Sequence, residues 1–339
     1  IGLLIRFNWS LISVLYDSTS YRMTNLFNEF KTKSQFLGIE FAVEDQINGD
    51  TNLNNMILLI NKLKAKSKIG AKVVVLLLKQ EQIKKLLQVG KKLNYDLGPG
   101  SGIRSGEFLW ITIESKEVFH EFPEESLGAL TIQQQVQTMS AFKNYFFNLN
   151  SRNNTRNPWF SQIEHKMFVP NGNPISNGIL IDKETTLTIN SMFAFANGLE
   201  IIRRKLCPEW RRGLCPAMKS HPKLSQLIYD VMRKSAFYGG DGRQVFFDYE
   251  NGHAINSLII SNLRHFTKSQ VGITSLAWLT VGKFSSDEGL AINLTKSRGY
   301  LTNGLDVPLT EIKSVCLHEL SCNIHSHLHV SLLIFVTNS

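Results

Sequence analysis

Polar residues follow three predicted strands of this 339-residue chain, and their side chains could bind a small ligand. They are residues 18–21, Lys79 with Gln80, and Glu114 with Ser115. In open parallel sheets, ligands bind in the crevice beyond the carboxyl ends of the strands. There, Glu114 could bind a cationic group, and Tyr21 could add a cation–π or stacking contact. We therefore expect a ligand site that also includes Ser18 and Lys79, the alternative being ordinary strand-end loops that bind nothing.

Motifs of the common catalytic sites are absent from the sequence. The glycine-rich residues 98–102, GPGSG, lack the Gly-Lys-Ser/Thr ending of a phosphate-binding loop and the strand–serine–helix context of a nucleophile elbow. This segment therefore predicts a turn. No HExxH sequence occurs, and the acidic pair Glu124 and Glu125 is more typical of a solvated loop than of an acid/base pair. We therefore expect the protein to have no enzymatic activity and no bound cofactor.

Two of the four cysteines, Cys207 and Cys215, lie eight positions apart around a proline and a glycine. This spacing favours a disulfide that closes a short loop over a metal pair. Such a bond contributes about 2–3 kcal/mol, mostly by restricting the unfolded chain. Two free thiols in a cytosolic protein are the alternative.

The other two cysteines lie in a histidine-rich C-terminal segment, where a zinc site is arithmetically possible. The residues are Cys316, His318, Cys322, His325, His327 and His329. We expect no metal there, because a biased tail of this kind is more typical of a disordered end.

Strand-like and helical segments alternate along the first part of the chain. Apolar runs predict strands at residues 9–16, 71–78, 108–113 and 129–132, and helical spacing predicts helices through residues 26–30, 56–63 and 80–89. Alternation of this kind indicates an α/β fold with a parallel sheet and right-handed crossovers.

Further along, the pattern predicts helices at residues 139–147, 189–206 and 221–235, and strands at 245–247, 255–260 and 277–281 that end the ordered part. One apolar stripe along the second of these helices is predicted to be core. It consists of Ile189, Met192, Phe193, Ala196, Leu199, Ile202 and Leu206.

Composition narrows the class of protein. The net charge is +9, but the basic residues are scattered without interleaved aromatic residues, which argues against nucleic acid. No run of eighteen apolar residues occurs, so we expect no transmembrane segment. The first ten residues lack an initiator methionine and a signal-peptide layout, and we expect a fragment that begins mid-domain. Sequons at Asn8, Asn153 and Asn293 predict glycosylation if the chain is secreted.

Several segments together resemble the extracellular ligand-binding domain of metabotropic glutamate receptors, in the class C G-protein-coupled receptor family. The segments are FNWSLISVLYD from Phe7, YFFNLNSRNNTRNPWF ending at Phe160, KLCPEWRRGLCPAM from Lys205, GDGRQVFFDYENGH from Gly240 and SVCLHELSC from Ser314. The resemblance implies a two-lobed clamshell of the type I periplasmic-binding-protein kind, with each lobe an α/β sandwich.

By this resemblance, the first half of lobe 1 is missing from the sequence. Residues 1–129 would form lobe 2, residues 130–247 the second half of lobe 1, and residues 248–297 the return to lobe 2. Residues 298–322 would lead towards a cysteine-rich domain, and residues 323–339 would be a tail outside the family.

The resemblance also assigns roles to individual residues. Tyr21 matches a tyrosine placed against the amino acid, and Glu114 falls where the family has an aspartate that contacts the ligand's ammonium. Lys79 stands in place of an acidic residue of the family. Glu184, beside Lys183, falls where a lysine would bind a distal carboxylate, which places glutamate as the ligand in doubt.

The function implied is sensing of an amino acid or related small molecule by lobe closure, on the extracellular side of the cell membrane. A homo- or heterodimer through lobe 1 is expected, with a G protein reached only through the missing seven-helix domain. The alternative is a degenerate or decoy receptor that acts through protein–protein association without sensing a ligand.

Overall fold

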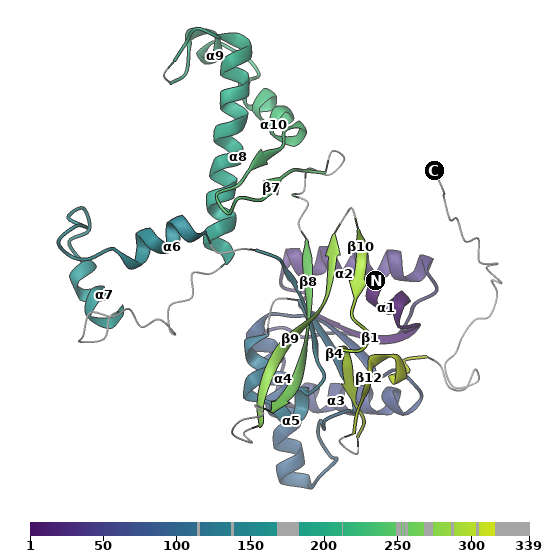
Figure 1. The fold of residues 1–339 in the computed structure, drawn as a ribbon. Coiled ribbons are helices and arrows are strands. Elements are labelled where there is room, and N and C mark those ends of the chain that lie inside the picture. The colour runs from purple at the N-terminus through teal and green to yellow at the C-terminus, as the bar shows by residue number, and fades with distance from the viewer. Residues whose placement is uncertain are drawn as a thin grey trace. The chain divides into compact units, whose positions relative to one another are not determined.

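The computed structural model describes residues 1–113, 116–136, 139–167, 183–211, 213–248, 252, 254, 257–267, 274–285, 288–302 and 305–315. The chain divides into two compact units (Figure 1). Unit 1 comprises Ile1–Gln133 and Leu258–Ser339, and unit 2 comprises Gln134–Ser257. The assignment of segments to particular lobes stays a prediction.

Unit 1 is organised around an eight-stranded mixed sheet in the order β10-β9-β8-β5-β4-β3-β1-β2. The strands are β1 Leu11–Tyr16, β2 Glu40–Gln46, β3 Val73–Leu77, β4 Leu109–Ile113, β5 Leu130–Gln134, β8 Leu258–Thr267, β9 Thr274–Ser285 and β10 Gly289–Ile292. The five strands from β5 to β2 run parallel, whereas β8, β9 and β10 form antiparallel pairs. The predicted mixed α/β class is confirmed, but the sheet is not parallel throughout.

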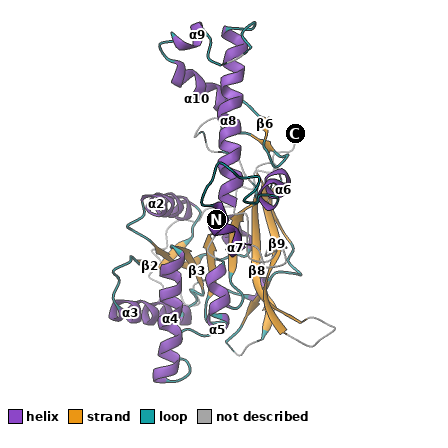
Figure 2. Cartoon of the chain, turned by 90° about the vertical axis from the view of Figure 1, so that its left-hand side faces the viewer, coloured by secondary structure: helices purple, strands orange, loops and turns teal. Residues whose placement is uncertain are grey.

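Helices cover both faces of this sheet (Figure 2). They are α1 Gly2–Arg6, α2 Tyr21–Phe36, α3 Leu53–Lys68, α4 Gln80–Leu97, the 3₁₀ helix η1 Glu117–Glu121 and α5 Pro123–Ser126. Successive side chains of a strand point to opposite faces. In β1, Leu15 joins the core beneath α3 and α4, while Ile12 and Val14 join the core beneath α1 and α2. Unit 1 is therefore a three-layer α/β/α sandwich.

Local polar contacts fix where the helices begin. Ser20 accepts a 3.4 Å hydrogen bond from the backbone N–H of Met23 at the start of α2, and Asn52 accepts one of 2.8 Å from Asn55 at the start of α3. Both residues satisfy a backbone donor that a helix end leaves unpaired. The caps therefore fix where the loops that follow β1 and β2 end.

The glycine-rich segment at residues 98–102 is a turn, as expected, and its polar groups are already used. The side-chain oxygen of Asn94 accepts from the backbone N–H groups of Gly100 at 3.1 Å and Gly102 at 2.8 Å. The Lys64 ammonium donates to the carbonyl oxygens of the same two glycines. This turn therefore does not present free N–H groups at these two glycines to a phosphate.

The final described part of unit 1 packs on the sheet. It contains β11 Arg298–Tyr300, β12 Asp306–Pro308 and the 3₁₀ helix η2 Leu309–Glu311. Val307, Leu309 and Ile312 are buried in the core that also contains α1 and α2. The apolar pattern predicts that the ordered part ends at residue 281, but residues 288–302 and 305–315 continue the ordered structure. The linker expected over residues 298–322 stays a prediction.

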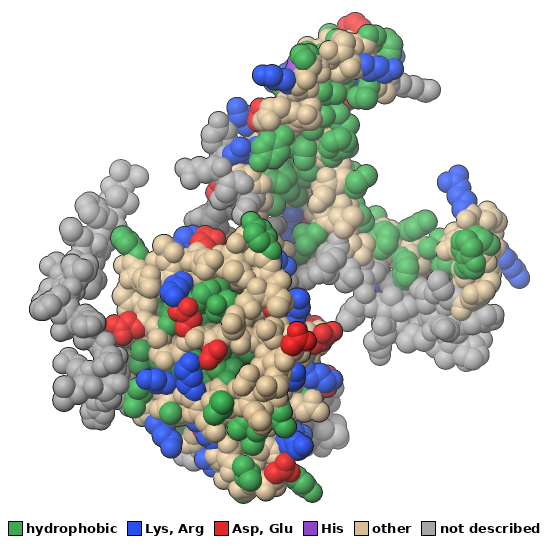
Figure 3. Space-filling model, turned by 180° about the vertical axis from the view of Figure 1, so that it is seen from behind, with side chains coloured by type: hydrophobic (Ala, Val, Ile, Leu, Met, Phe, Trp, Pro, Cys, Tyr) green, Lys and Arg blue, Asp and Glu red, His purple; other side chains and the backbone are tan. Residues whose placement is uncertain are grey.

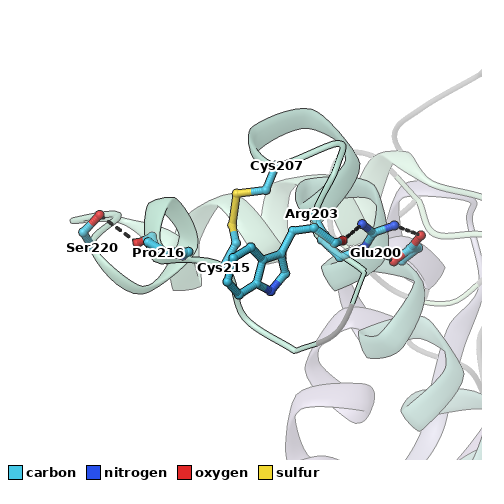
Figure 4. The surroundings of a disulfide bond; sticks show 7 residues. Glu200, Arg203, Cys207, Cys215, Pro216 and Ser220 are labelled. Carbon is cyan, nitrogen blue, oxygen red and sulfur yellow. Dashed lines mark hydrogen bonds and ion pairs between the residues drawn. A yellow bond between two sulfur atoms is a disulfide. The ribbon is translucent and has the colours of Figure 1, made fainter.

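Unit 2 is mainly helical. Its elements are α6 Ser140–Phe147, α7 Phe160–Met167, α8 Lys183–Leu206, α9 Pro216–Lys219, α10 Leu224–Lys234, β6 Phe237–Tyr238 and β7 Gln244–Val245. The expected disulfide between Cys207 and Cys215 is present, with Cα atoms 6.5 Å apart (Figure 4). Buried Ile202, Cys215 and Met218 form a small core between α8, α9 and α10. The disulfide thus links the end of α8 to the small core that contains Cys215.

The prediction that the whole apolar stripe of α8 lies in the core is wrong. Among its members, Met192 is 68% exposed and Phe193 is 47% exposed, whereas Ile202 is fully buried. Periodicity identifies an apolar face but cannot say whether another element covers it. In the described part of unit 2, α10 covers only the second half of α8, around Leu199 and Ile202.

One further expectation from the sequence requires correction, and two elements have no counterpart among the predicted ones. Glu125 is 3% exposed and lies in α5, so Glu124 and Glu125 are not a solvated pair. The sequence pattern predicts neither strand β2 nor helix α7. Only Val43 of β2 is fully buried, so the apolar pattern that normally marks a strand is weak there.

Candidate functional site

The site at the carboxyl ends of β1 and β3 is built around Asp17, which directly follows β1. Its side chain is fully buried, and its Oδ1 accepts hydrogen bonds from the backbone N–H of Thr19 at 3.0 Å and the Thr19 hydroxyl at 2.6 Å. Its own N–H donates to the carbonyl oxygen of Leu77, at the end of β3. Asp17 is therefore fixed by both strands and by its own loop.

Lys79 reaches Asp17 from the neighbouring strand end. It precedes the first residue of α4, and its backbone N–H donates a 2.8 Å hydrogen bond to the side-chain oxygen of Gln82. Its Nζ lies 3.3 Å from Oδ2 of Asp17, and the Lys79 side chain is 58% exposed. The pair thus joins a fully buried carboxylate to a lysine whose side chain is largely exposed to solvent.

The environment keeps Asp17 ionised. Burial raises the pKa of this carboxyl, but the two hydrogen bonds from Thr19 and the polar groups of Gln82 and Lys79 lower it, and the net pKa lies below the ordinary value. A carboxylate that accepts hydrogen bonds is stabilised in its charged form. Asp17 therefore presents a negative charge to Lys79 at neutral pH.

Gln82 connects this site to the third strand end. It is buried, and its side-chain N–H donates a 2.9 Å hydrogen bond to the carbonyl oxygen of Ile47, just after β2. The backbone N–H of Ile47 in turn donates to the carbonyl oxygen of Tyr16 at 3.0 Å. The carboxyl ends of β1, β2 and β3 are thereby held together by polar contacts.

The structure brings some of the predicted site residues together. Ser18 is exposed next to Asp17, and Tyr21 is the first residue of α2, where the residue is 83% exposed. Ser18 and Lys79 thus both adjoin Asp17. Glu114 lies outside the described residues. Glu184 lies within α8, in unit 2, and its side chain is likewise outside what the structure describes.

Asp17 and Gln82 are the functional candidates that sequence reasoning missed. A signal was present for Asp17, because an aspartate directly after a buried strand sits where parallel sheets bind ligands. For Gln82 the spacing to Lys79 is that of a capping pair, but its burial depends on the loop after β2.

A polar depression of about 470 Å³ lies beside the end of β2. Its lining residues are Asp45, Gln46, Asn48, Asp50, Thr51, Asn55, Leu58, Leu59 and Lys62. Asp45 already pairs with Lys62 at 3.1 Å. The described residues contain no group of three or more histidine, cysteine, aspartate or glutamate side chains that could hold a metal, and the cysteines and histidines after residue 315 lie outside them.

The three sequon asparagines are exposed. Asn8 has a positive φ of 54°, which asparagine tolerates better than most residues, and the Asn293 side-chain oxygen accepts a 2.7 Å hydrogen bond from the hydroxyl of Thr295. Asn153 donates a 2.8 Å hydrogen bond to the carbonyl oxygen of Asn148. All three positions can be reached from solvent.

Among the residues that the structure describes, no helix combines the length and apolar character needed to cross a bilayer.

Comparison with known proteins identifies the class of this chain. A family model described as "Receptor family ligand binding region" matches residues 1–265. The mixed α/β sandwich of unit 1 is consistent with the type I periplasmic-binding-protein fold. The chain belongs to the receptor family ligand-binding regions.

Proposed function

We propose that this chain is the extracellular ligand-binding region of a metabotropic glutamate receptor-like, class C G-protein-coupled receptor that senses an amino acid or related small molecule. The observation that carries the proposal is the ion pair between buried Asp17 and exposed Lys79 at the strand ends. Parallel sheets bind ligands at this position. The family match to a ligand-binding region supports the same reading.

In this proposal, the ligand changes the population of a closed state. A ligand can do so only if it binds that state more tightly than the open one. Tyr21, exposed at the start of α2, offers a ring for stacking on the ligand. The seven-helix domain of the receptor class would carry the signal to a G protein.

An extracellular location is supported by the disulfide and the exposed sequons. Disulfides persist in oxidising compartments, and Cys207–Cys215 is one such bond. Expression in a secretory host tests this part of the proposal. We expect the mass to fall on enzymatic removal of N-glycans, and by one glycan less in an Asn293→Gln variant.

A thermal-shift screen of the chain with the common amino acids tests ligand sensing. We expect at least one amino acid to raise the unfolding temperature, because a ligand that binds only the native state stabilises it. Tyr21→Ala should reduce the shift. Tyr95→Ala is the matched control, since Tyr95 is also exposed, at 90%, but lies late in α4. Stabilisation by no amino acid would contradict the proposal.

A non-sensing receptor that acts by protein association is the second candidate. The observation in its favour is the exposed apolar surface of α8, which includes Met192, Phe193 and Phe195. Figure 3 shows apolar side chains gathered along this helical part. A homo- or heterodimer through unit 2 would cover such a surface. Co-purification with a receptor ectodomain, together with a failed amino-acid screen, favours this candidate.

A further inference from the structure

The Asp17–Lys79 pair is asymmetric in a way that a simple surface ion pair is not. Asp17 is fully buried, while the Lys79 side chain is 58% exposed. Exposed pairs hold both partners loosely, because each side chain retains its freedom. Here one partner is immobilised by the Thr19 hydrogen bonds and by its backbone contact with Leu77. The position of the carboxylate is therefore fixed, and only the lysine side chain can lose conformational freedom when a ligand binds.

A lysine ammonium has three N–H donors, so the contact with Asp17 leaves donors for another partner. The Lys79 backbone is fixed as well, because its N–H is bound by Gln82, which is itself bound to Ile47. The remaining donors are therefore held near the ends of β1 and β3 and in contact with solvent. An ammonium forms its strongest hydrogen bonds with carboxylates and phosphates.

We propose that Lys79 binds an acidic group of the ligand, and that Asp17 is the positioning residue that holds the Lys79 ammonium for this purpose. This inference rests on the proposed ligand site and names its ligand class: small molecules that carry a carboxylate. Asp17 does not contact the ligand. Its fixed position reduces the conformational freedom that Lys79 loses on binding.

Pure electrostatics predicts the opposite role for Asp17. A negative charge 3.3 Å from Nζ weakens the attraction between Lys79 and any anion, so its removal would tighten anion binding. Positioning predicts that removal weakens binding, because the ammonium is no longer held. The Asp17→Asn variant separates the two, since asparagine keeps an oxygen acceptor for Thr19 and loses the charge.

The experiment measures binding of succinate, with neutral succinamide as its matched probe, by thermal shift and calorimetry at constant ionic strength. The full chain is compared with Lys79→Met, Asp17→Asn and Lys84→Met. Lys84 is the control, because it is also an ion-paired, 48% exposed lysine of α4, bound to Glu121. We expect succinate alone to bind, with affinity roughly tenfold or more lower in Lys79→Met, lower in Asp17→Asn and unchanged in Lys84→Met.

Three outcomes overturn the inference: no succinate binding to the unmodified chain, equal binding by Lys79→Met, or equal or tighter binding by Asp17→Asn. Should Asp17→Asn fail to fold, the exposed Lys79→Met substitution still decides the role of the lysine. The amino-acid screen separates this inference from the proposed function. Succinate binding through Lys79 without any amino-acid response leaves the inference standing and contradicts the sensing of amino acids. If an amino acid stabilises the chain and Lys79→Met does not change that stabilisation, the sensor proposal stands and the role inferred for Lys79 is contradicted.

Discussion

Trp9 and Ile312 are 303 positions apart in the sequence, yet the indole Nε1 of Trp9 donates a 2.7 Å hydrogen bond to the carbonyl oxygen of Ile312. Both side chains are buried. Two residues further on, the Ser314 hydroxyl donates to the carbonyl oxygen of Leu11 and accepts a 3.0 Å hydrogen bond from the backbone N–H of Val73. The end of the described chain is thereby bound to the first residues of β1 and β3.

The first prediction concerns this long-range contact. Trp9→Phe keeps an aromatic ring but removes the N–H donor, leaving the Ile312 carbonyl without this partner. We expect the free energy of unfolding to fall by about 1–3 kcal/mol, the usual cost of an unsatisfied buried polar group. Denaturant unfolding measures the loss. Trp159→Phe is the control, since Trp159 is 66% exposed and its replacement should change little. Equal effects in the two variants would show that the hydrogen bond contributes nothing.

The second prediction concerns the buried carboxyl group of Glu125. Burial raises its pKa, the Lys91 charge lowers it in part, and the Glu124 charge raises it further. Because the pKa is higher in the folded state than in the unfolded state, stability falls as pH rises through the folded pKa. Glu125→Gln removes this dependence. We expect the variant to be more stable than the parent at neutral pH, by on the order of 1 kcal/mol, and equally stable below about pH 4.

The control for Glu125 is its neighbour. Glu124→Gln removes a charge on the exposed side of α5, and this charge is the smallest of the influences on the Glu125 pKa, so the variant should keep most of the pH dependence of unfolding. Chemical denaturation at several pH values between 4 and 8 measures both variants. If the free energy of unfolding of Glu125→Gln changes with pH in the same way as that of the parent, the pKa of Glu125 does not differ between the folded and unfolded states.

Much of unit 1 could be predicted because its strands carry their signal locally. Residues 73–77 are continuously apolar and all buried, and a strand there follows from the sequence alone. Strand β2 has no such signal, since it lies at the sheet edge and buries few side chains. The antiparallel pairing of β8 with β9 was also beyond reach, because strand order depends on contacts between distant segments.

The site shows the same division between local and distant information. The strand-end rule finds Ser18 and Lys79, because their positions depend only on where β1 and β3 end. It does not find that Lys79 pairs with Asp17, since that contact joins residues from two strands. The sequence also does not distinguish Glu125 from Glu124, because the burial of Glu125 depends on how α5 packs near α4.

The third prediction concerns the disulfide of unit 2. Replacing both Cys207 and Cys215 by serine avoids a lone thiol, and should destabilise the unit by about 2–3 kcal/mol on the chain-entropy model. Hydrogen exchange of the full chain locates the effect. We expect faster exchange at the end of α8 and in α9, which share a core with Cys215, and unchanged exchange in β1 and β3. A uniform increase across both units would contradict a local staple.

The fourth prediction separates two costs of replacing a glycine. Gly38 and Gly106 have nearly the same positive φ, 70° and 73°, but different surroundings. A Cβ at Gly38 meets nothing within 4 Å, whereas one at Gly106 would lie 2.2 Å from the backbone carbon of Leu301. Gly38→Ala should therefore cost only the backbone strain, about 1–2 kcal/mol. Gly106→Ala adds a clash with backbone that cannot rotate away.

We expect Gly106→Ala to lower the free energy of unfolding clearly more than Gly38→Ala, since overpacking adds about 1–3 kcal/mol to the strain. The added cost should fall on the contact between the loop before β4 and the segment after β11, because Leu301 must move. Hydrogen exchange around residues 298–302 measures that movement. If the two alanine variants unfold at the same denaturant concentration, the close approach of Gly106 to Leu301 is not part of the folded structure in solution.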